Sequence, residues 1–404
     1  MKKGALAFLL VILTFSFLLA SCAPKSEPAG TGREDVIDLS PESITKAEDT
    51  EPEVYKKLTF AAVGDNIIYQ AGLTDAKNRS DGSRPFNFLP NYTNIAETIA
   101  SADIAFINQE TPLAGEKYGY SDYPLFNSPQ SLAEDLITVG FDVIAMANNH
   151  MLDMGTNGLA DTIAYYKTLS DRVTMIGGYE NEADFNTPRI VERDGIKIAF
   201  VAFTYATNGL SLSQNSDIYI PYIDDEAIES SIAAAREQAD LVFVSMHWGD
   251  ENVFQPNNGQ KRVAQLIADC GADVIIGHHP HVIQPMEWLE GEEGNKTLCI
   301  YSLGDLIAVM TRASNMLGGL VTFDIVQEGD EFRIENPIFN PTVFHFGPSY
   351  YNGKIYFLSD FTPELERTFG NVYGITDGYN ELSAIVKELI DDEFLPEYLK
   401  NVQE

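Results

Sequence analysis

The sequence predicts an α/β protein in which helices pack on β-sheets. Short apolar runs rich in β-branched residues recur along the chain, and each ends abruptly at polar residues or glycine, which is typical of buried strands. Amphipathic segments of helical length lie between several of these runs. Alternating strands and helices favour sheets that are covered by helices.

The chain begins with a predicted lipoprotein signal peptide, residues 1–21. Lys2 and Lys3 precede an apolar stretch that is short for a membrane span of about 20 residues. The stretch ends in Leu19-Ala20-Ser21-Cys22, which resembles the bacterial lipobox, in which the cysteine is lipidated and becomes the mature N-terminus. An uncleaved anchor helix or an ordinary signal peptide is the alternative. Lipidation at Cys22 predicts an extracytoplasmic protein anchored to a bacterial cell membrane.

Residues 22–56 are predicted to form a disordered acidic tether. The segment is poor in large apolar residues, contains four prolines and carries a surplus of acids. Such a composition buries too little surface to offset the entropy of ordering. An N-terminal strand with a weak signal is the alternative.

The predicted strands of the body share a sharp boundary between an apolar run and a polar end. They comprise residues 58–63, 104–107, 143–147, 241–246, 274–276 and 298–301, with a longer central strand at 196–205. One helix is expected from Ser128-Pro129 to a stop at Gly140, and two others over 224–238 and 259–270. Residues 57–320 form the main body. Residues 321–404 form a β-rich and helical extension that completes the same domain.

Composition excludes several classes of protein. The 404 residues include 26 Lys plus Arg and 60 Asp plus Glu, a net charge of 26 − 60 = −34. This acidity argues against general binding of nucleic acid or anionic lipid, which both need a basic surface. Three cysteines in so long a chain exclude a disulfide scaffold, and no disulfide is expected. Cleavage before Cys22 would remove two Lys and no acids, which gives −34 − 2 = −36.

Histidines are concentrated at the ends of predicted strands. Five of the six directly follow apolar runs: His150, His247, His278, His279 and His281. In open α/β sheets, the carboxyl ends of the strands are where ligand sites form. Imidazole suits Zn, Mn and Fe, and carboxylate oxygens suit harder ions. These histidines therefore predict a metal site.

Six candidate ligands follow from this placement: Asp65, Glu110, Asn149, His247, His279 and His281. They are too many for one tetrahedral site and are about right for two divalent ions that share a bridging carboxylate. In His279-Pro280-His281 the proline is expected to fix a bend that turns both imidazoles to one side. His278 is either a ligand or a neighbour that packs against the site.

These motifs, in this order, resemble the CapA family of bacterial capsule proteins, which is similar in fold to the calcineurin-like metallophosphoesterases. The resemblance covers about 58–319. It rests on Val63-Gly64-Asp65, Asn108-Gln109-Glu110, Asn148-Asn149-His150 with Asp153 and Gly155, His247-Trp248-Gly249, Gly277 to His281, and Tyr301-Ser302-Leu303-Gly304. It implies a four-layer α/β/β/α sandwich and a role in poly-γ-glutamate synthesis, export or surface attachment.

The resemblance also implies roles for single residues. Asp65 corresponds to the aspartate that opens the metallophosphoesterase site, and Glu110 stands where those enzymes usually place a bridging Asp. His150 corresponds to their proton donor. Asp153 is expected to orient its imidazole, with a plain turn carboxylate as the alternative. Asn66, Asn108, His278, Trp248 and Arg312 are candidate substrate-binding residues, although Trp248 is as compatible with packing and Arg312 is better suited to a surface ion pair.

Two positions depart from the family pattern. Phosphoesterases usually carry a His two residues after the first Asp, where this chain has Ile67, so the first metal is expected to bind weakly or not at all. The Ser-Leu-Gly segment is usually followed by Asn, where this chain has Asp305. We interpret Asp305 as a solvated turn residue, with an unusual ligand as the alternative.

Three functions are compatible with these residues. The first is a surface protein that uses its metal site on poly-γ-glutamate, alongside a membrane synthase complex. The second is a phosphoesterase or other hydrolase of a small anionic substrate. The third is a polymer-binding scaffold without catalysis.

Overall fold

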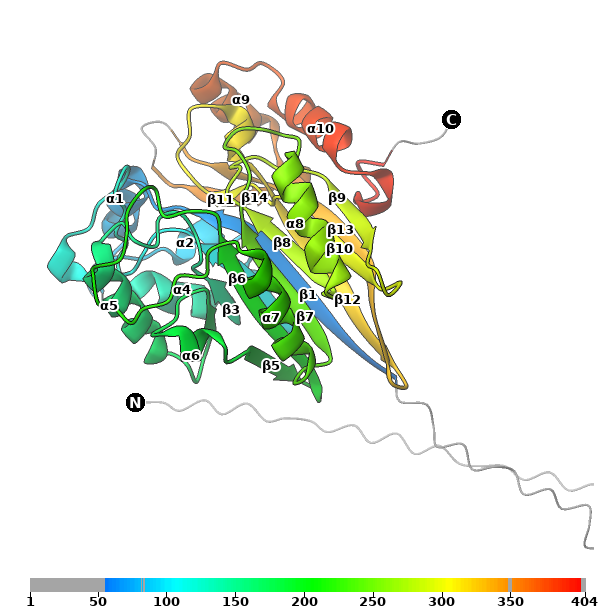
Figure 1. Cartoon of the computed structure of the whole chain (residues 1–404). Helices are drawn as coiled ribbons and strands as arrows, with labels where there is room; N and C mark the ends of the chain where they lie inside the picture. The colour runs from blue at the N-terminus through cyan, green and yellow to red at the C-terminus, as the bar shows by residue number, and fades with distance from the viewer. Residues whose placement is uncertain (1–54, 81, 83, 348–350, 401–404) are drawn as a thin grey trace, which may run out of the picture. The chain divides into compact units, whose positions relative to one another are not determined.

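The structure is a computed structural model of the chain and describes residues 55–80, 82, 84–347 and 351–400 (Figure 1). The predicted signal peptide, Cys22 and nearly all of the predicted tether lie outside these residues. Strand β1 starts at Tyr55, two residues before the predicted boundary at 57. In the part of the chain that the structure describes, no helix has both the length and the apolar character that a membrane span needs.

The described strands form two mixed sheets. The first has the order β14-β13-β12-β1-β2-β3-β4, with β11 also pairing with β1, and the second has the order β5-β6-β7-β8-β10-β9. The bounds are β1 (Tyr55–Asn66), β2 (Ile104–Gln109), β3 (Val143–Ala145), β4 (Thr174–Ile176), β5 (Arg189–Arg193), β6 (Ile196–Thr204), β7 (Leu241–His247), β8 (Val274–His278), β9 (Met286–Glu290), β10 (Lys296–Ile300), β11 (Asp305–Ile307), β12 (Leu317–Glu328), β13 (Glu331–His345) and β14 (Lys354–Phe357).

Aromatic rings fill the space between the two sheets. Phe60 of β1 lies 6.2 Å from Phe200 of β6 and 5.1 Å from Phe243 of β7, measured between ring centroids. Phe323 of β12 lies 4.8 Å from Phe60. These rings are almost fully buried, so the sheets pack face to face around an apolar core.

Helices cover the outer faces of both sheets. Successive side chains of a strand point to opposite faces, so buried strands with apolar residues at every position need cover on both sides. Helices α7 (Asp225–Arg236) and α8 (Asn258–Asp269) lie across the second sheet (Figure 1), where they share a core with alternate residues of β6 and β7. Helices α4 (Ser131–Val139) and α5 (Gly155–Lys167) pack in the core of the first sheet. The predicted four-layer α/β/β/α sandwich is confirmed.

The helices start and stop largely where their capping residues predict. Asp224 caps α7 by accepting a hydrogen bond from Ala227 N–H, and Asn257 forms a capping box with Gln260 at α8. The bounds are α1 (Gln70–Asn78), α2 (Leu89–Tyr92), α3 (Ala96–Ser101), α4 (Ser131–Val139), α5 (Gly155–Lys167), α6 (Glu182–Phe185), α7 (Asp225–Arg236), α8 (Asn258–Asp269), α9 (Pro363–Tyr373) and α10 (Gly378–Leu389), with 3₁₀ turns η2 (Glu116–Tyr118), η3 (Ala313–Met316), η5 (Leu358–Asp360) and η6 (Asp392–Phe394).

The helix expected from Ser128-Pro129 starts later than predicted. Helix α4 begins at Ser131, and Gly140 ends it in a left-handed conformation with φ 117°, as the sequence predicted. The C-terminal segment enters the first sheet, because β12 pairs antiparallel with β1 and β13 pairs with β12. The predicted start of this segment at 321 falls inside β12.

The carboxyl ends of two groups of parallel strands meet at one place in the protein. Strands β1, β2 and β3 run parallel in the first sheet, as do β6, β7 and β8 in the second. Strand β11 joins this edge, since Asp65 N–H donates to Gly304 C=O at 2.9 Å. A side chain at Gly64 would overlap that carbonyl, so the close approach requires glycine there.

Candidate metal centre

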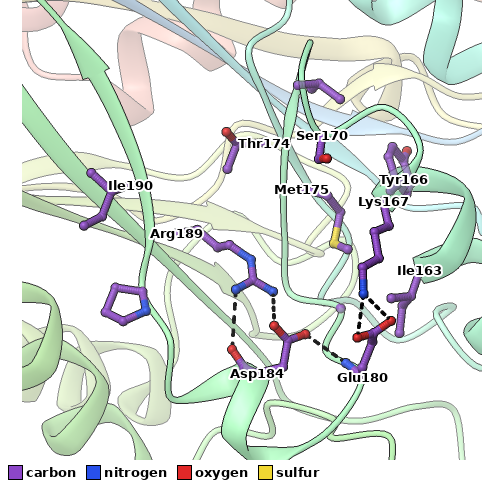
Figure 2. A pocket seen from close by; sticks show the side chains of 13 residues that line it. Ile163, Tyr166, Lys167, Ser170, Thr174, Met175, Glu180, Asp184, Arg189 and Ile190 are labelled. Carbon is purple, nitrogen blue, oxygen red and sulfur yellow. Dashed lines mark hydrogen bonds and ion pairs between the residues drawn. The ribbon is translucent and has the colours of Figure 1, made fainter.

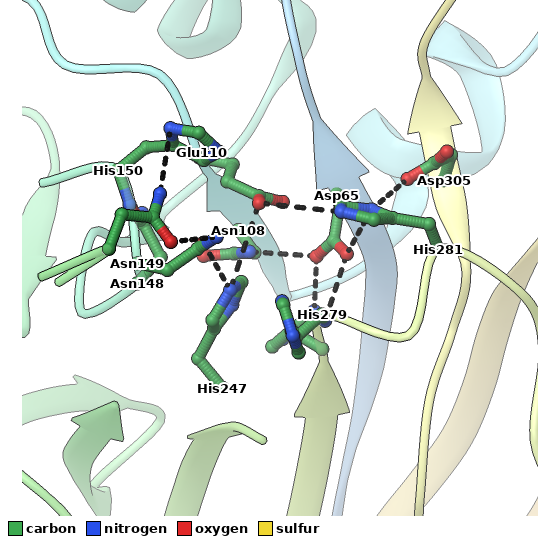
Figure 3. A network of polar contacts seen from close by, with 12 residues as sticks. Asp65, Asn108, Glu110, Asn148, Asn149, His150, His247, His279, His281 and Asp305 are labelled. Atoms are coloured by element: carbon green, nitrogen blue, oxygen red, sulfur yellow. Dashed lines mark hydrogen bonds and ion pairs between the residues drawn. The ribbon is translucent and has the colours of Figure 1, made fainter. Parts of the chain in front are cut away.

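Residues from both sheets meet at the carboxyl ends of the parallel strands (Figure 3). The first sheet supplies Asp65 at the end of β1 and Glu110 directly after β2. The second sheet supplies His247 as the last residue of β7 and the turn after β8. All of these side chains are buried.

The turn His279-Pro280-His281 has an unusual backbone. His279 has φ 97° and His281 has φ 54°, both in the left-handed region that non-glycine residues rarely adopt. The N–H of His279 donates to Asp65 Oδ2 at 3.0 Å, which ties the turn to the first sheet. Strained backbone of this kind is concentrated at functional sites. The expected bend is present, and the left-handed conformation of both histidines produces it.

Glu110 is the central residue of the cluster. It is fully buried, and neither carboxylate oxygen has a hydrogen-bond partner among the described residues. Oε1 lies 3.7 Å from His247 Nε2 and 3.8 Å from His281 Nε2. A buried carboxylate normally has partners, because desolvation of an unpaired charge is costly. The position between two imidazoles fits a carboxylate that contacts cations.

Two overlapping sets of potential ligand atoms share Glu110. The first set is Asp65, Glu110 and His281, and the second set is Glu110, His247 and His279. Within each set the ligand atoms lie within 4.8 Å of one another. Asn149 adjoins the second set, since its Oδ1 is 2.9 Å from His247 Nε2. Nitrogen and oxygen donors of this kind fit Mn, Zn or Fe.

Charges in the cluster shift several pKa values. Burial raises the pKa of Glu110 well above its usual range, and the neighbouring charge of Asp65 adds to the shift. Burial also opposes ionisation of Asp65, but the hydrogen bond and charge of His278 outweigh it and lower the pKa of Asp65. A bound cation would stabilise both carboxylates in their ionised form.

The histidines divide into two kinds. Burial, followed by the charges of neighbouring histidines, lowers the pKa of His247 well below its usual range and that of His279 to about 3. Burial acts in the same direction on His281, but Asp305 and Glu110 outweigh it and raise the pKa of His281 well above its usual value. His247 and His279 are therefore neutral, as metal ligands must be, whereas His281 carries a proton.

Asp305 is not the solvated turn residue that we expected. It is buried in β11, and its Oδ1 lies 2.9 Å from His281 Nδ1. Burial raises the pKa of Asp305 to about 7, although His281 opposes the shift. The expectation was wrong because the pairing of β11 with β1 places Asp305 beside Asp65 inside the protein. Asp305 holds the imidazole of His281, as carboxylates behind metal-binding histidines do.

His150 and Asp153 form a hydrogen-bonded pair at the edge of the cluster. His150 Nδ1 lies 2.8 Å from Asp153 Oδ2, and both residues are buried. Asp153 Oδ2 also accepts the N–H of Phe126 at 2.7 Å, whose ring packs against His150 at 4.8 Å between centroids. This geometry fits the predicted orienting role of Asp153 and leaves Nε2 of His150 for another partner.

Three of the predicted substrate-binding residues form hydrogen bonds with other residues inside the protein. Asn66 donates to Gln109 Oε1 at 2.6 Å and accepts from the hydroxyl of Tyr92 at 2.9 Å, so both ends of its amide are occupied. Asn108 donates to Asp65 Oδ1 at 2.7 Å and so orients a ligand. Trp248 is buried in the core under α7 and α8, and its indole N–H donates to a backbone carbonyl at 3.0 Å. Internal hydrogen bonds account for the burial of Asn66, and packing in the core accounts for that of Trp248.

The other two candidates lie in different surroundings. His278 stacks on Phe106 with 5.7 Å between centroids, and its Nδ1 lies 3.1 Å from Asp65 Oδ1, so it packs against and orients a ligand. Arg312 is exposed and forms no ion pair with any residue that the structure describes. The expected surface ion pair is thus not found for Arg312 within those residues.

Three residues near the cluster were not anticipated from the sequence. Glu251, on the loop after β7, brings a carboxylate to His279 and His281. The ring of Tyr205 lies 4.5 Å from that of His279, and burial raises the pKa of Tyr205 to about 12. Asn208 accepts a hydrogen bond from Asn149 at 3.3 Å. All three lie on loops, and no local pattern in the sequence distinguishes them from other loop residues.

A separate pocket of about 370 Å³ lies between α5, β4 and β5 (Figure 2). Its charged side chains pair with one another, Lys167 with Glu180 at 2.9 Å and Arg189 with Asp184 at 2.8 Å. No residue of the two ligand sets lines this pocket. The concentration of potential metal ligands thus lies elsewhere, at the strand ends.

Fold and site together define a four-layer α/β protein with two mixed sheets and a buried His, Asp and Glu cluster that is compatible with a metal site. The chain belongs to the family described as bacterial capsule synthesis protein PGA_cap, whose model matches residues 59–310. The predicted family membership is therefore confirmed.

Two curated relatives carry names from capsule synthesis. The PGA biosynthesis protein CapA of Bacillus subtilis (strain 168) is 30% identical over 211 residues, which cover 51% of this chain and 53% of that protein. The capsule biosynthesis protein CapA of Bacillus anthracis is 29% identical over 265 residues, which cover 62% of this chain and 60% of that protein. The matches thus span little more than half of each relative.

Solved structures of phosphoesterases are similar at a lower level. A phosphatase from Mycoplasma pneumoniae gives a TM-score of 0.45 at 12% identity, covering 72% of this chain and 95% of that one. The calcineurin-like phosphoesterase YfkN from Bacillus subtilis gives 0.39 at 13% identity, covering 83% and 100%.

Proposed function

We propose that the protein is a divalent-metal-dependent hydrolase or transferase that acts on poly-γ-glutamate in capsule synthesis, export or release. The observation that carries this proposal is Glu110, a buried carboxylate with two unpartnered oxygens between two sets of potential ligands. Membership of the capsule synthesis family and the names of the two CapA relatives support the choice of polymer.

The chain's own residues have separate roles in this reaction. Asp65, Glu110, His247, His279 and His281 would hold the ions, with the Asn149 oxygen beside them. Divalent ions bound there would lower the pKa of a bound water and polarise the scissile carbonyl.

We assign the role of proton donor to His150. Its Nδ1 is engaged by Asp153 at 2.8 Å, which fixes the ring and leaves Nε2 to carry the proton. In hydrolysis of a γ-amide, a water oxygen bonds to the carbonyl carbon, the C–N bond breaks, and the leaving amine takes the proton from Nε2.

Metal is also needed on electrostatic grounds. The polymer is anionic, and the chain has a net charge of −34, or −36 after cleavage before Cys22 (−34 − 2). Long-range repulsion therefore opposes binding unless cations in the centre attract the polymer's carboxylates. Polymer that binds equally well with and without metal would contradict this account.

The membrane anchor is a further part of the proposal. We infer that Cys22 is lipidated and that residues 22–56 tether the folded body to the extracytoplasmic face of the membrane, near partners of a synthase complex. Metabolic labelling with a fatty acid tests it: the full chain should be labelled, Cys22→Ser should not, and the control Cys270→Ser should. Equal labelling of all three would disprove the anchor.

One experiment separates the proposed function from its alternatives. Protein purified without chelator is analysed for metal and assayed on γ-linked glutamate oligomers and on a phosphodiester dye. Metal with cleavage of the oligomer supports the proposal, whereas metal with cleavage of the dye alone supports a phosphoesterase. Protein that neither contains nor binds metal would leave only a non-catalytic scaffold.

A further inference from the structure

Glu251 brings an exposed carboxylate to the buried cluster. One of its oxygens lies within 4.8 Å of a ring nitrogen of His279 and of His281. His281 belongs to the first ligand set and His279 to the second, so Glu251 adjoins both. Nδ1 of His279 is buried and has no hydrogen-bond partner in the described part of the chain, which leaves a donor atom free.

The loop that carries Glu251 is fixed to the turn that carries both histidines. The N–H of Asn252 donates to Pro280 C=O at 2.8 Å. Asn315 Nδ2 donates to Asn252 Oδ1 and to His281 C=O, both at 2.8 Å. Asn252 has φ 62°, in the left-handed region. The position of Glu251 over the histidines is therefore built into the loop.

Contact with solvent alone does not explain the position of the Glu251 carboxylate. An exposed Glu normally projects into water, and the side chain of Glu251 has no ion pair or hydrogen bond within residues 55–80, 82, 84–347 and 351–400. Here the carboxylate is directed toward a centre that already holds Asp65, Glu110 and Asp305. Like charges at short range repel one another, and a cation among them reverses the sign of the interaction.

We propose that Glu251 is an additional metal ligand, supplied by a loop, that closes the centre on its solvent side. The inference rests on the proposed function, because it requires that the centre binds divalent ions. Since Glu251 is exposed and the other ligands are buried, it occupies the side from which an anionic substrate arrives. A substrate oxygen therefore competes with this carboxylate for the ion.

The test compares Glu251→Gln with a matched control, Asp250→Asn. Both changes remove one negative charge from neighbouring exposed positions of the same loop, but the Asp250 carboxylate is held by Asn257 at 2.7 Å. Metal-free full-length protein is titrated with Mn²⁺ and with Zn²⁺ by calorimetry. Metal-loaded protein is then titrated with inorganic phosphate.

The expected result is a loss of about tenfold or more in metal affinity for Glu251→Gln, and less than about twofold for Asp250→Asn. Phosphate should bind more tightly to metal-loaded Glu251→Gln than to the wild type. Equal metal affinities in the two variants would overturn the role of Glu251 and leave the proposed function intact. A wild type that binds neither metal would overturn both.

Discussion

The two ligand sets of the centre differ in the protons that they carry. In the second set, burial keeps His247 and His279 neutral by lowering their pKa values. In the first set, Asp305 and Glu110 overcome burial and raise the pKa of His281. A metal ion must displace the proton of His281 from the first set, whereas the two histidines of the second set carry no such proton. Any proton on Glu110 is common to both sets. Histidines thus differ in protonation between the two sets, because the number of carboxylates around each histidine differs.

Unequal sites agree with the expectation that the first metal binds weakly or not at all. The sequence suggested this from Ile67, which stands where phosphoesterases usually have a histidine. The structure adds a second reason in the proton on His281. We therefore expect the second set to fill first and the first set to fill at higher metal concentration.

The largest effect is expected for His150→Gln, which separates chemistry from metal binding. Loss of a general acid costs about 10²- to 10⁴-fold in kcat, while both metal affinities should stay unchanged because His150 belongs to neither set. Turnover of the γ-linked oligomer and metal content are measured together. Asp153→Asn should give a smaller loss. Wild-type turnover in His150→Gln would remove His150 from the mechanism.

The next effect is the loss of the tighter ion in His279→Ala. Removing a ligand from the second set should weaken its ion about a hundredfold, and the ion of the first set should be affected less. His345→Gln is the control, because it changes a buried imidazole outside the centre whose Nε2 lies 3.1 Å from a backbone carbonyl. Equal loss of both ions would contradict two separable sets.

The pH dependence of metal affinity tests the difference between the two ligand sets without a mutation. A raised pKa means that His281 is protonated at neutral pH, so raising the pH removes the competing proton and strengthens binding. Each proton that must leave adds about a tenfold rise in affinity per pH unit, so affinity at the first set should rise more steeply than affinity at the second set until the pKa of His281 is passed. Deprotonation of Glu110 affects both sets alike. Calorimetry in two buffers of different ionisation enthalpy counts the protons released. Identical slopes would show that the sets do not differ in protonation.

The smallest effect is expected for Asp305→Asn. The change removes the carboxylate that holds His281 Nδ1 at 2.9 Å, which weakens the first set about tenfold at high pH. The same change lowers the pKa of His281, so the loss should shrink toward neutral pH. The second set should not change. Titrations at two pH values detect the difference, and a loss confined to the second set would contradict the assignment.

Local sequence predicted much of the fold and the core of the centre. Apolar runs that end at Asp65, Glu110, His247 and His278 mark strand ends, and parallel strands bring such ends together. Those patterns are local, because a buried strand needs apolar residues and polar residues follow where the strand ends.

The features of the centre that the sequence did not predict depend on contacts between segments that are distant in the sequence. Asp305 is buried because β11 pairs with β1, far away in sequence. Glu251 reaches the centre because Asn315 fixes its loop to the His281 turn. The left-handed backbone of His279 depends on its hydrogen bond to Asp65, which lies in the other sheet. None of these contacts leaves a pattern in neighbouring residues.

The central claim is that Glu110 belongs to both sets, and metal titration of wild type and Glu110→Gln tests it most directly. Glu110 has both oxygens unpartnered, and its Oε1 lies within 3.8 Å of a histidine of each set. Calorimetry of metal-free wild type should show two ions per chain with different affinities, and Glu110→Gln should weaken both. Two ions that remain tightly bound in Glu110→Gln would contradict the shared carboxylate.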